Sequence, residues 1–188
     1  IVCLDPGHIS EVGAGTSGKK VTELQAVWDI AVAAKPLLEA KGIKVIMTKS
    51  KVDQVVKNRE RAATANSSKA DLMVRLHMDA APERGWSTYH PHRKGTVQGV
   101  TGPSDWVIKQ STVAAGAFHR GVMTVLKGKH PDRGLRNESK TAIGAKQGAL
   151  TCSIFSEVPV VLVEMATLTM PEDEAFVASK SGMKLLAQ

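Results

Sequence analysis

Strand-like and helix-like patterns alternate along the first part of the chain. Short apolar runs at residues 1–4, 43–48 and 71–76 are bounded by glycine, proline or polar residues, which is typical of buried strands. Helical patterns fill the segments between them, at residues 22–41 and 55–69. Strands that alternate with helices long enough to cross over a sheet indicate parallel neighbours. The pattern therefore predicts an α/β fold.

The first helix has recognisable ends. Thr22 is the expected N-cap, and Gly42 is the expected stop. Pro36 lies inside the pattern, and because proline lacks a backbone N–H we expect it to kink or shorten the helix. Residues 9–20, which precede this helix, contain three glycines and are expected to form a loop.

The middle of the chain is less regular. Residues 80–104 are rich in Pro, Gly, Thr, His and Arg, and predict a long loop with a brief edge strand at residues 86–89. Helical spacing returns at residues 104–127. The apolar residues expected to form the buried stripe of this helix are Trp106, Val107, Val113, Ala117, Phe118, Met123 and Leu126.

The last third of the chain returns to apolar segments. Residues 128–148 are expected to be irregular, whereas residues 149–154 and 158–165 predict strands. The closing helix is expected to start near Pro171, because proline suits the first helical position and three acidic residues follow it. No repeat or composition break divides the chain, so we expect one domain over residues 1–188.

The charge balance narrows the functional classes. A formal net charge of +7 favours polyanionic surroundings such as nucleic acid, an anionic lipid surface or an acidic cell-wall polymer. Aromatic residues make up only 4% of the chain, too few for an evident base-stacking platform, and the basic residues form no block. Nucleic-acid binding is therefore only a weak alternative. No run of about 20 apolar residues predicts a transmembrane span.

The two cysteines, Cys3 and Cys152, both lie beside apolar residues. We expect them to be small buried core residues. Their spacing leaves a disulfide between them open.

Three of the apolar runs lead to side chains with metal or acid–base chemistry: His8, His77 and Glu164. Because the carboxyl ends of parallel strands share one edge of a sheet, these side chains are expected to lie close together. A catalytic zinc usually has three protein ligands and one open position. His8 and His77 suit two of these places, and Glu23, at the start of the first helix, suits the third. Glu11 is the alternative carboxylate.

Several motifs in this order resemble the zinc-dependent N-acetylmuramoyl-L-alanine amidases, which hydrolyse peptidoglycan. The short metalloprotease motif His-Glu-x-x-His is absent. The motifs that carry the resemblance are residues 4–8 (Leu-Asp-Pro-Gly-His), Glu23, Arg61, residues 65–66 (Ala-Asn), residues 70–71 (Ala-Asp), residues 76–80 (Leu-His-Met-Asp-Ala) and residues 161–164 (Val-Leu-Val-Glu). Together they cover nearly the whole chain.

The resemblance implies a site and a reaction. His8, Glu23 and His77 would hold zinc, and Glu164 would be the catalytic carboxylate that transfers a proton during attack by activated water. The bond cleaved would be the amide between N-acetylmuramic acid and the L-alanine of the stem peptide. The implied fold is a single domain with one twisted, mostly parallel sheet of about six strands and helices on both faces.

The resemblance also implies a setting. The expected location is the bacterial cell envelope, either periplasmic or secreted, and the expected substrate is peptidoglycan. We expect a monomer with no nucleic-acid partner. An activator protein or a wall-binding module would lie outside these 188 residues.

Two segments depart from the family pattern. Ile9 and Ser10 stand where a Gly-Gly pair is usual, and residues 165–169 read Met-Ala-Thr-Leu-Thr where Gly-Phe and a later Ser-Asn are usual. Both segments adjoin the expected cleft. A catalytically weak or inactive wall-binding module on the same fold is therefore the alternative function.

Four other polar residues have two possible roles each. Asp5 and Asp79 either orient the histidines or form turns. Arg133 and Arg136 either meet carboxylates of the stem peptide or lie on a solvated face. The remaining polar residues of interest are expected to support the fold or to be exposed: Arg61, Asn66, His90, His92, His119 and His130.

Overall fold

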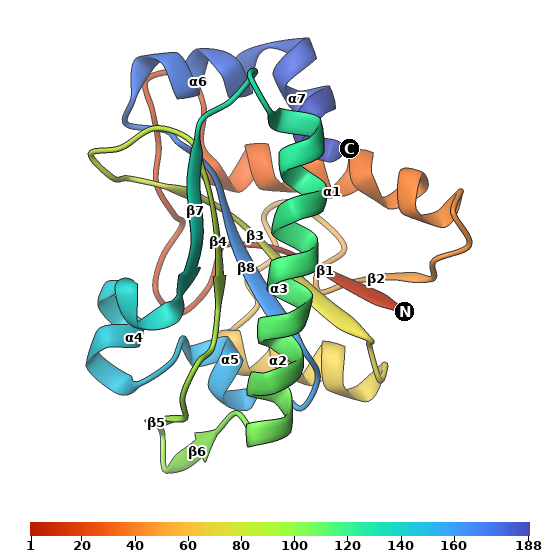
Figure 1. The fold of residues 1–188 in the computed structure, drawn as a ribbon, viewed down its shortest axis with the longest axis vertical. Helices are drawn as coiled ribbons and strands as arrows, with labels where there is room; N and C mark the ends of the chain where they lie inside the picture. Colours follow the sequence, from red (N-terminus) through yellow and green to blue (C-terminus); the bar gives the residue numbers. More distant parts are fainter.

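A six-stranded sheet forms the centre of the protein (Figure 1), whose computed structural model describes all 188 residues. The strand order is β2-β1-β3-β8-β4-β7. The first four strands of this order run parallel, β4 is antiparallel to β8, and β7 is parallel to β4. The strands are β1 (Val2–Pro6), β2 (Val45–Met47), β3 (Leu72–Asp79), β4 (Trp86–His90), β7 (Asp132–Asn137) and β8 (Val160–Thr167). The predicted mostly parallel sheet is confirmed.

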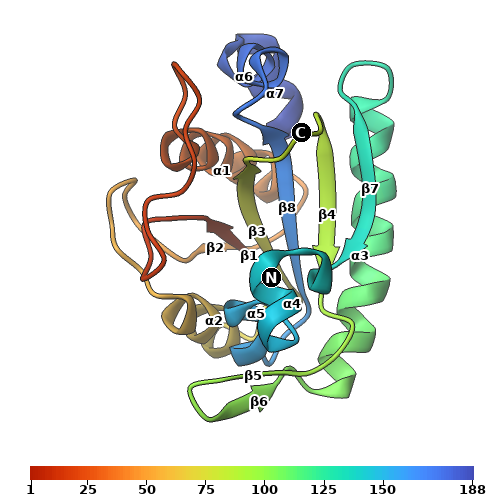
Figure 2. The same ribbon diagram turned by 90° about the vertical axis from the view of Figure 1, so that its left-hand side faces the viewer.

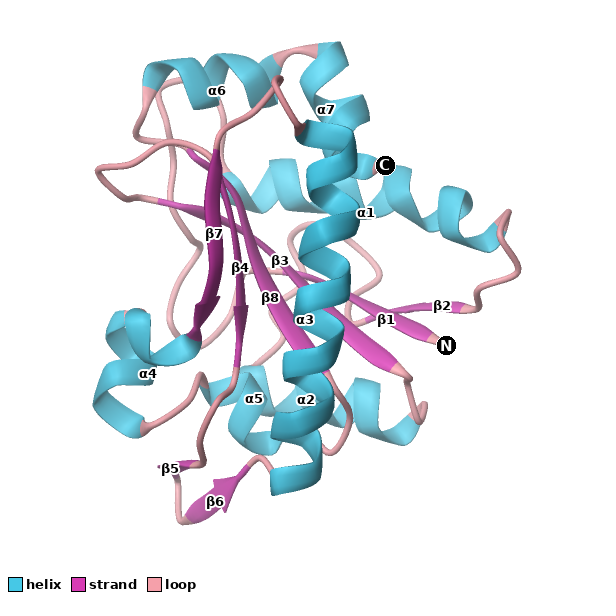
Figure 3. Ribbon diagram, in the orientation of Figure 1, coloured by secondary structure: helices cyan, strands magenta, loops and turns pink.

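Helices lie on both sides of this sheet, as Figures 2 and 3 show. They are α1 (Glu23–Glu39), α2 (Asn58–Ser67), α3 (Asp105–Leu126), α4 (Ala142–Gln147), α5 (Thr151–Phe155), α6 (Pro171–Ala178) and α7 (Lys180–Ala187), with a 3-10 turn η1 at Glu138–Lys140. A small hairpin, β5 (Gly95–Val97) and β6 (Val100–Gly102), extends from one end. None of the helices is long and apolar enough to cross a membrane.

Alternation of side chains along the strands creates two cores. Leu4, Val74 and Val161 belong to the larger core, which includes residues of α1, α3, α6 and α7. Their chain neighbours Cys3, Met73 and Val160 point to the other face and pack against α2 and α5. Both cysteines are buried and free, as expected for core residues. The sheet is thus covered on both faces.

Three predictions for the second half of the chain are wrong. Residues 149–154 are not a strand, because α5 begins at Thr151. Residues 86–89 belong to β4, which is not an edge strand, because β7 pairs beyond it. The edge strand is β7, which lies in the segment at residues 128–148 predicted to be irregular. Its residues DRGLRN include a single large apolar side chain, Leu135, and show no apolar alternation, as expected of a half-exposed edge.

Two details of the helices also differ from expectation. In the predicted stripe of α3, Val107 and Leu126 are buried as expected. Trp106 (57% exposed), Val113 (64%) and Ala117 are exposed instead. Helix α1 continues through Pro36 as far as Glu39, so proline does not shorten it. Thr22 is its N-cap and accepts a hydrogen bond from the Gln25 N–H, as predicted.

A buried ion cluster joins β1, β3, α2 and the residue that follows β2. The Asp5 carboxylate accepts hydrogen bonds from Arg61 Nη1 (2.6 Å), Arg75 Nε (2.9 Å) and Thr48 Oγ1 (2.6 Å). Burial alone would raise the pKa of Asp5, but the two guanidinium groups and the threonine hold it below its usual range. Asp5 therefore orients no histidine, and Arg61 supports the fold as expected.

A second buried acid, Glu138, lies under α4 and α5. It accepts hydrogen bonds from the Leu150 N–H (2.7 Å) and from Ser153 Oγ (2.6 Å). Burial raises its pKa to about 7, against the effect of these two donors. A glutamine would fill the same space without the charge.

This raised pKa predicts a pH-dependent difference between wild type and Glu138→Gln. In the unfolded chain the group titrates at about pH 4, so the folded wild type binds more protons between about pH 4 and pH 7. The free energy of unfolding of wild type should fall relative to the variant as pH rises through this window, by up to about 3 kcal/mol. Denaturant titrations from pH 4 to pH 8 measure the difference. Exposed Glu157→Gln is the control, and a pH-independent gap would contradict the prediction.

Candidate metal centre

His8, Glu23 and His77 converge at the carboxyl end of the sheet. Glu23 Oε1 lies 3.0 Å from His77 Nδ1 and 3.3 Å from His8 Nε2. One ligand atom from each of the three residues lies within 4.8 Å of the others. Two ligands of a tetrahedral zinc, each about 2.0 Å from the ion, are about 3.3 Å apart. The spacing and the donor types therefore fit a zinc site with three protein ligands.

Three separate elements deliver these side chains. His8 follows the end of β1, His77 lies on β3, and Glu23 is the first residue of α1. His77 and Glu164 lie inside their strands and do not end them, because β3 continues to Asp79 and β8 to Thr167. These side chains nevertheless lie close together at one edge of the sheet, as predicted.

The Glu23 carboxylate is buried and fully hydrogen-bonded. Oε1 accepts from the Met78 N–H (3.0 Å) and Oε2 from the Thr16 N–H (2.8 Å). Burial alone would raise its pKa, but His77 and His8 hold the pKa well below its usual range. Glu23 is therefore an anion, the form that binds a metal.

The two histidines present different protonation preferences without a metal. Burial lowers the pKa of His77, although its contact with Glu23 opposes this. For His8, burial also lowers the pKa, but the hydrogen bond to Glu23 outweighs it and the net shift is upward. His8 Nδ1 lies 3.1 Å from the Gly13 carbonyl, which can only accept, so Nδ1 carries the proton. This bond leaves Nε2 for a metal, as ligating imidazoles usually require.

Two glycines make room for the three ligands. A Cβ on Gly7 would lie 2.5 Å from His77 Cε1, so the imidazole ring packs directly on the backbone. Gly15 has a φ of +88°, and a Cβ there would lie 2.5 Å from Glu23 Oε2 and 2.8 Å from His8 Cδ2. Side chains at either position would intrude into the ligand cluster.

Two buried cations hold the loop that carries His8. Lys49 is 3% exposed, and its Nζ donates to the carbonyl oxygens of His8 (2.5 Å) and Val52 (3.0 Å). Arg61 Nη2 donates to the Ile9 carbonyl at 3.1 Å. Sequence reasoning missed Lys49, because a lysine in the polar stretch after a strand resembles any exposed lysine.

Glu164 lies beside the three candidate ligands. On β8 it is opposite His77 of β3 on one side and opposite Ser87 of β4 on the other. Its Oε2 is buried without a hydrogen-bond partner. Burial raises the pKa of Glu164 well above its usual value, and the negative charges of Glu23 and Asp79 add to the effect. A bound divalent cation would lower this pKa again.

The structure resolves the remaining alternatives for acidic groups. Glu11 is not part of the cluster, because its carboxylate accepts from the backbone N–H (2.9 Å) and Nδ2 (3.1 Å) of Asn58 at the start of α2. Asp79 contacts neither candidate histidine ligand. It accepts from Arg133 Nη2 (2.8 Å) and from the N–H of the next residue, Ala80 (2.7 Å).

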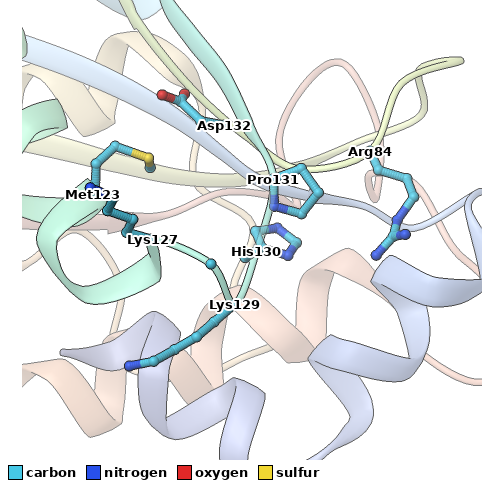
Figure 4. Close-up of a pocket in the computed structure, with 8 residues that line it drawn as sticks. Arg84, Met123, Lys127, Lys129, His130, Pro131 and Asp132 are labelled. Atoms are coloured by element: carbon cyan, nitrogen blue, oxygen red, sulfur yellow. The ribbon is translucent and has the colours of Figure 1, made fainter.

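Two histidines outside the cluster, His119 and His130, have structural partners. His119 lies 3.0 Å from Thr88 Oγ1 and 3.3 Å from Asp132 Oδ1. His130 lies in a surface hollow at the C-terminal end of α3 (Figure 4), where Nε2 is 3.0 Å from the Met165 carbonyl. In the same hollow, Lys129 Nζ donates to a carbonyl of α3. This hollow contains none of the four candidate site residues.

The close packing of Gly15 against Glu23 and His8 predicts a local effect on metal affinity. Gly15→Ala should weaken zinc binding by at least about tenfold, because its Cβ would displace Glu23 and His8. Gly99→Ala, in the hairpin between β5 and β6, is the matched control: its φ is also positive (+76°), but its Cβ would meet nothing within 4 Å. Competition with a chromogenic chelator measures both dissociation constants. An equal loss of zinc affinity in the two variants would contradict this prediction and indicate that backbone strain alone weakens binding.

Comparison with known proteins identifies the family of this chain. The model of a family described as N-acetylmuramoyl-L-alanine amidase matches residues 2–188. The amidase AmiC of Neisseria meningitidis is 27% identical over all of this chain and 50% of its own length. AmiC of Escherichia coli is 35% identical over 45% of this chain and 20% of its own. The chain thus spans about half, or less, of these curated relatives.

Solved structures show the same fold. Ami1 from Mycobacterium smegmatis superposes with a TM-score of 0.79 at 20% identity, covering 99% of this chain and 90% of Ami1. The catalytic domain of CwlV from Bacillus (Paenibacillus) polymyxa gives 0.77 at 21% identity, over 100% and 91%. Because the family model covers nearly the whole sequence, this chain belongs to the N-acetylmuramoyl-L-alanine amidase family.

Proposed function

We propose that this domain is a zinc-dependent hydrolase that cleaves the amide between N-acetylmuramic acid and L-alanine in peptidoglycan. The observation that carries the proposal is the cluster of His8, Glu23 and His77 with Glu164 directly opposite His77 on the neighbouring strand. In the proposed roles the first three residues hold zinc and Glu164 is the catalytic acid–base. Family membership supports the choice of bond.

The chemistry of the bound ion is general. Zinc in such a site lowers the pKa of a coordinated water to about 7 and polarises a nearby carbonyl oxygen. His8, Glu23 and His77 would hold the ion with the donor atoms already described. The ionised Glu23 offsets part of its charge.

Glu164 would perform the two proton transfers of the hydrolysis. Its carboxylate takes a proton from water as the oxygen bonds to the scissile carbonyl carbon. It then delivers this proton to the nitrogen as the C–N bond breaks. The products are the lactyl carboxylate of the sugar and a free amino group on L-alanine. A partly buried carboxyl with a raised pKa is suited to the second transfer.

The two departures from the family pattern leave this arrangement in place. Ile9 is fixed by its carbonyl, which accepts hydrogen bonds from Arg61 and from the Val56 N–H (3.1 Å). Met165 is buried in the larger core, and the Thr167 N–H donates to Asp173 (2.9 Å). Neither departure brings a side chain into the cluster of candidate ligands, so both leave room for the proposed chemistry.

The proposed setting is the bacterial cell envelope, where peptidoglycan lies. One structural neighbour, CwlD from Clostridioides difficile, was solved in complex with the GerS lipoprotein. A protein partner is therefore compatible with this fold. We propose a monomer that acts on peptidoglycan with or without such a partner.

Substitution of the catalytic carboxylate tests the function. Glu164→Gln should lower kcat by about 10²- to 10⁴-fold while zinc content stays near one per chain, because the residue transfers protons and does not hold the ion. Mass analysis of digested cell wall should detect stem peptides with a new L-alanine amino terminus. Chelation should abolish their release and added zinc should restore it.

Exposed Glu157→Gln is the control and should behave as wild type. Intact muropeptides after incubation with zinc-loaded wild type would refute the enzyme and favour the wall-binding module.

A further inference from the structure

Arg133 occupies an irregular position on the edge strand. Trp86 of β4 pairs with Asp132, but the next residue, Ser87, pairs with Gly134, so Arg133 is the extra residue of a bulge. Gly134 has a φ of +91°, which glycine adopts without strain. Bulges re-aim side chains, often near active sites. Here the side chain turns inward and is only 6% exposed, so it is not on a solvated face.

The Arg133 guanidinium joins the strands that carry the proposed catalytic groups. Nη2 donates to Asp79 Oδ2 (2.8 Å), two residues beyond His77. Nη1 donates to Thr167 Oγ1 (3.2 Å), three residues beyond Glu164. Its third donor, Nε, is buried and has no hydrogen-bond partner. A fixed guanidinium with one free N–H therefore lies beside the site.

Arg136 turns back toward the same place. Its Nε donates to the Arg133 carbonyl at 2.9 Å, and its Nη2 donates to Glu83 Oε2 at 3.3 Å. The same oxygen of Glu83 lies 3.9 Å from Arg133 Nε. A carboxylate from the loop after β3 is thus positioned between the two guanidinium groups.

Glu83 is held there through its backbone and not through its side chain. Its carbonyl accepts a hydrogen bond from Thr167 Oγ1 at 2.6 Å, whereas its side chain is 64% exposed. An exposed carboxylate can leave the arginines at little cost, because exposed ion pairs contribute little. A substrate carboxylate could then occupy its place.

We infer that Arg133 and Arg136 bind a free carboxylate of the stem peptide, and that Glu83 competes for this place when substrate is absent. The inference rests on the proposed function. The carboxylate that fits is the one on the α-carbon of the second stem residue, D-isoglutamate. It is the free carboxylate nearest to the scissile amide, and Arg133 is anchored only two and three residues along β3 and β8 from His77 and Glu164. An amidated residue, D-isoglutamine, offers no charge there.

A pair of soluble muropeptides that differ only in this carboxylate tests the inference. Wild type should show a lower KM for the D-isoglutamate form. Arg136→Gln should raise that KM by about tenfold or more and leave the KM for the D-isoglutamine form nearly unchanged. Arg136→Lys should recover part of the loss, because the charge remains. Exposed Arg120→Gln is the matched control for net charge.

Removal of the competing Glu83 carboxylate should change KM in the opposite direction. Glu83→Gln should lower the KM for the D-isoglutamate form by a few fold and leave the other form unaffected. A structural role of Glu83 would not improve one substrate selectively.

Binding separates this inference from the proposed function. The inactive Glu164→Gln variant should bind the D-isoglutamate muropeptide more tightly than the D-isoglutamine one, and adding Arg136→Gln should remove the difference. This measurement, by calorimetry, needs no turnover, so it decides the inference even if wild type cleaves neither muropeptide. Equal binding of the two forms, or an equal loss on both after Arg136→Gln, would overturn it.

Discussion

The ion cluster of Asp5, Arg61 and Arg75 is the constraint on which the site depends. All three side chains are buried, and an unpaired charge there would cost several kcal/mol. The requirement for pairing fixes β1 against β3 through Arg75 and against α2 through Arg61. His8 follows Asp5 by only three residues, so its position depends directly on this cluster.

The cations of this cluster also influence the protonation of the site. Arg61 and Arg75 pair with Asp5, and Lys49, outside the cluster, is a third buried cation near the loop that carries His8. Burial lowers the pKa of His77, and the charge of Arg75 lowers it further. The neutral imidazole is the form that binds a metal, so burial, aided by Arg75, favours the form of His77 that the proposed role requires.

Glu23 and Glu164 show how environment divides the roles of two glutamates. Glu23 accepts two backbone N–H bonds and contacts both histidines, which keeps it ionised. Glu164 has a buried oxygen with no donor, and its pKa shifts the opposite way. Opposite shifts in neighbouring carboxyls commonly separate a charged group from a proton-transfer group. The same division underlies the roles proposed here.

The sequence by itself determined the α/β class, the parallel first half of the sheet and the candidate residues of the site. These depend on local patterns: an apolar run with a functional residue near its end is visible without the fold. Local patterns also explain the errors. A short apolar run at residues 149–154 suits a strand or a helix equally, and the mostly polar β7 shows no apolar alternation.

Only the tertiary structure decided which polar residues support the site. The Lys49 contact with His8 spans 41 residues, and the Arg133 contact with Asp79 spans 54. Glu11 and Glu23 looked similar in the sequence, yet one caps α2 and the other meets both histidines. Such roles arise from strand pairing, a one-residue bulge and burial. These are properties of distant segments packed together, and no local pattern encodes them.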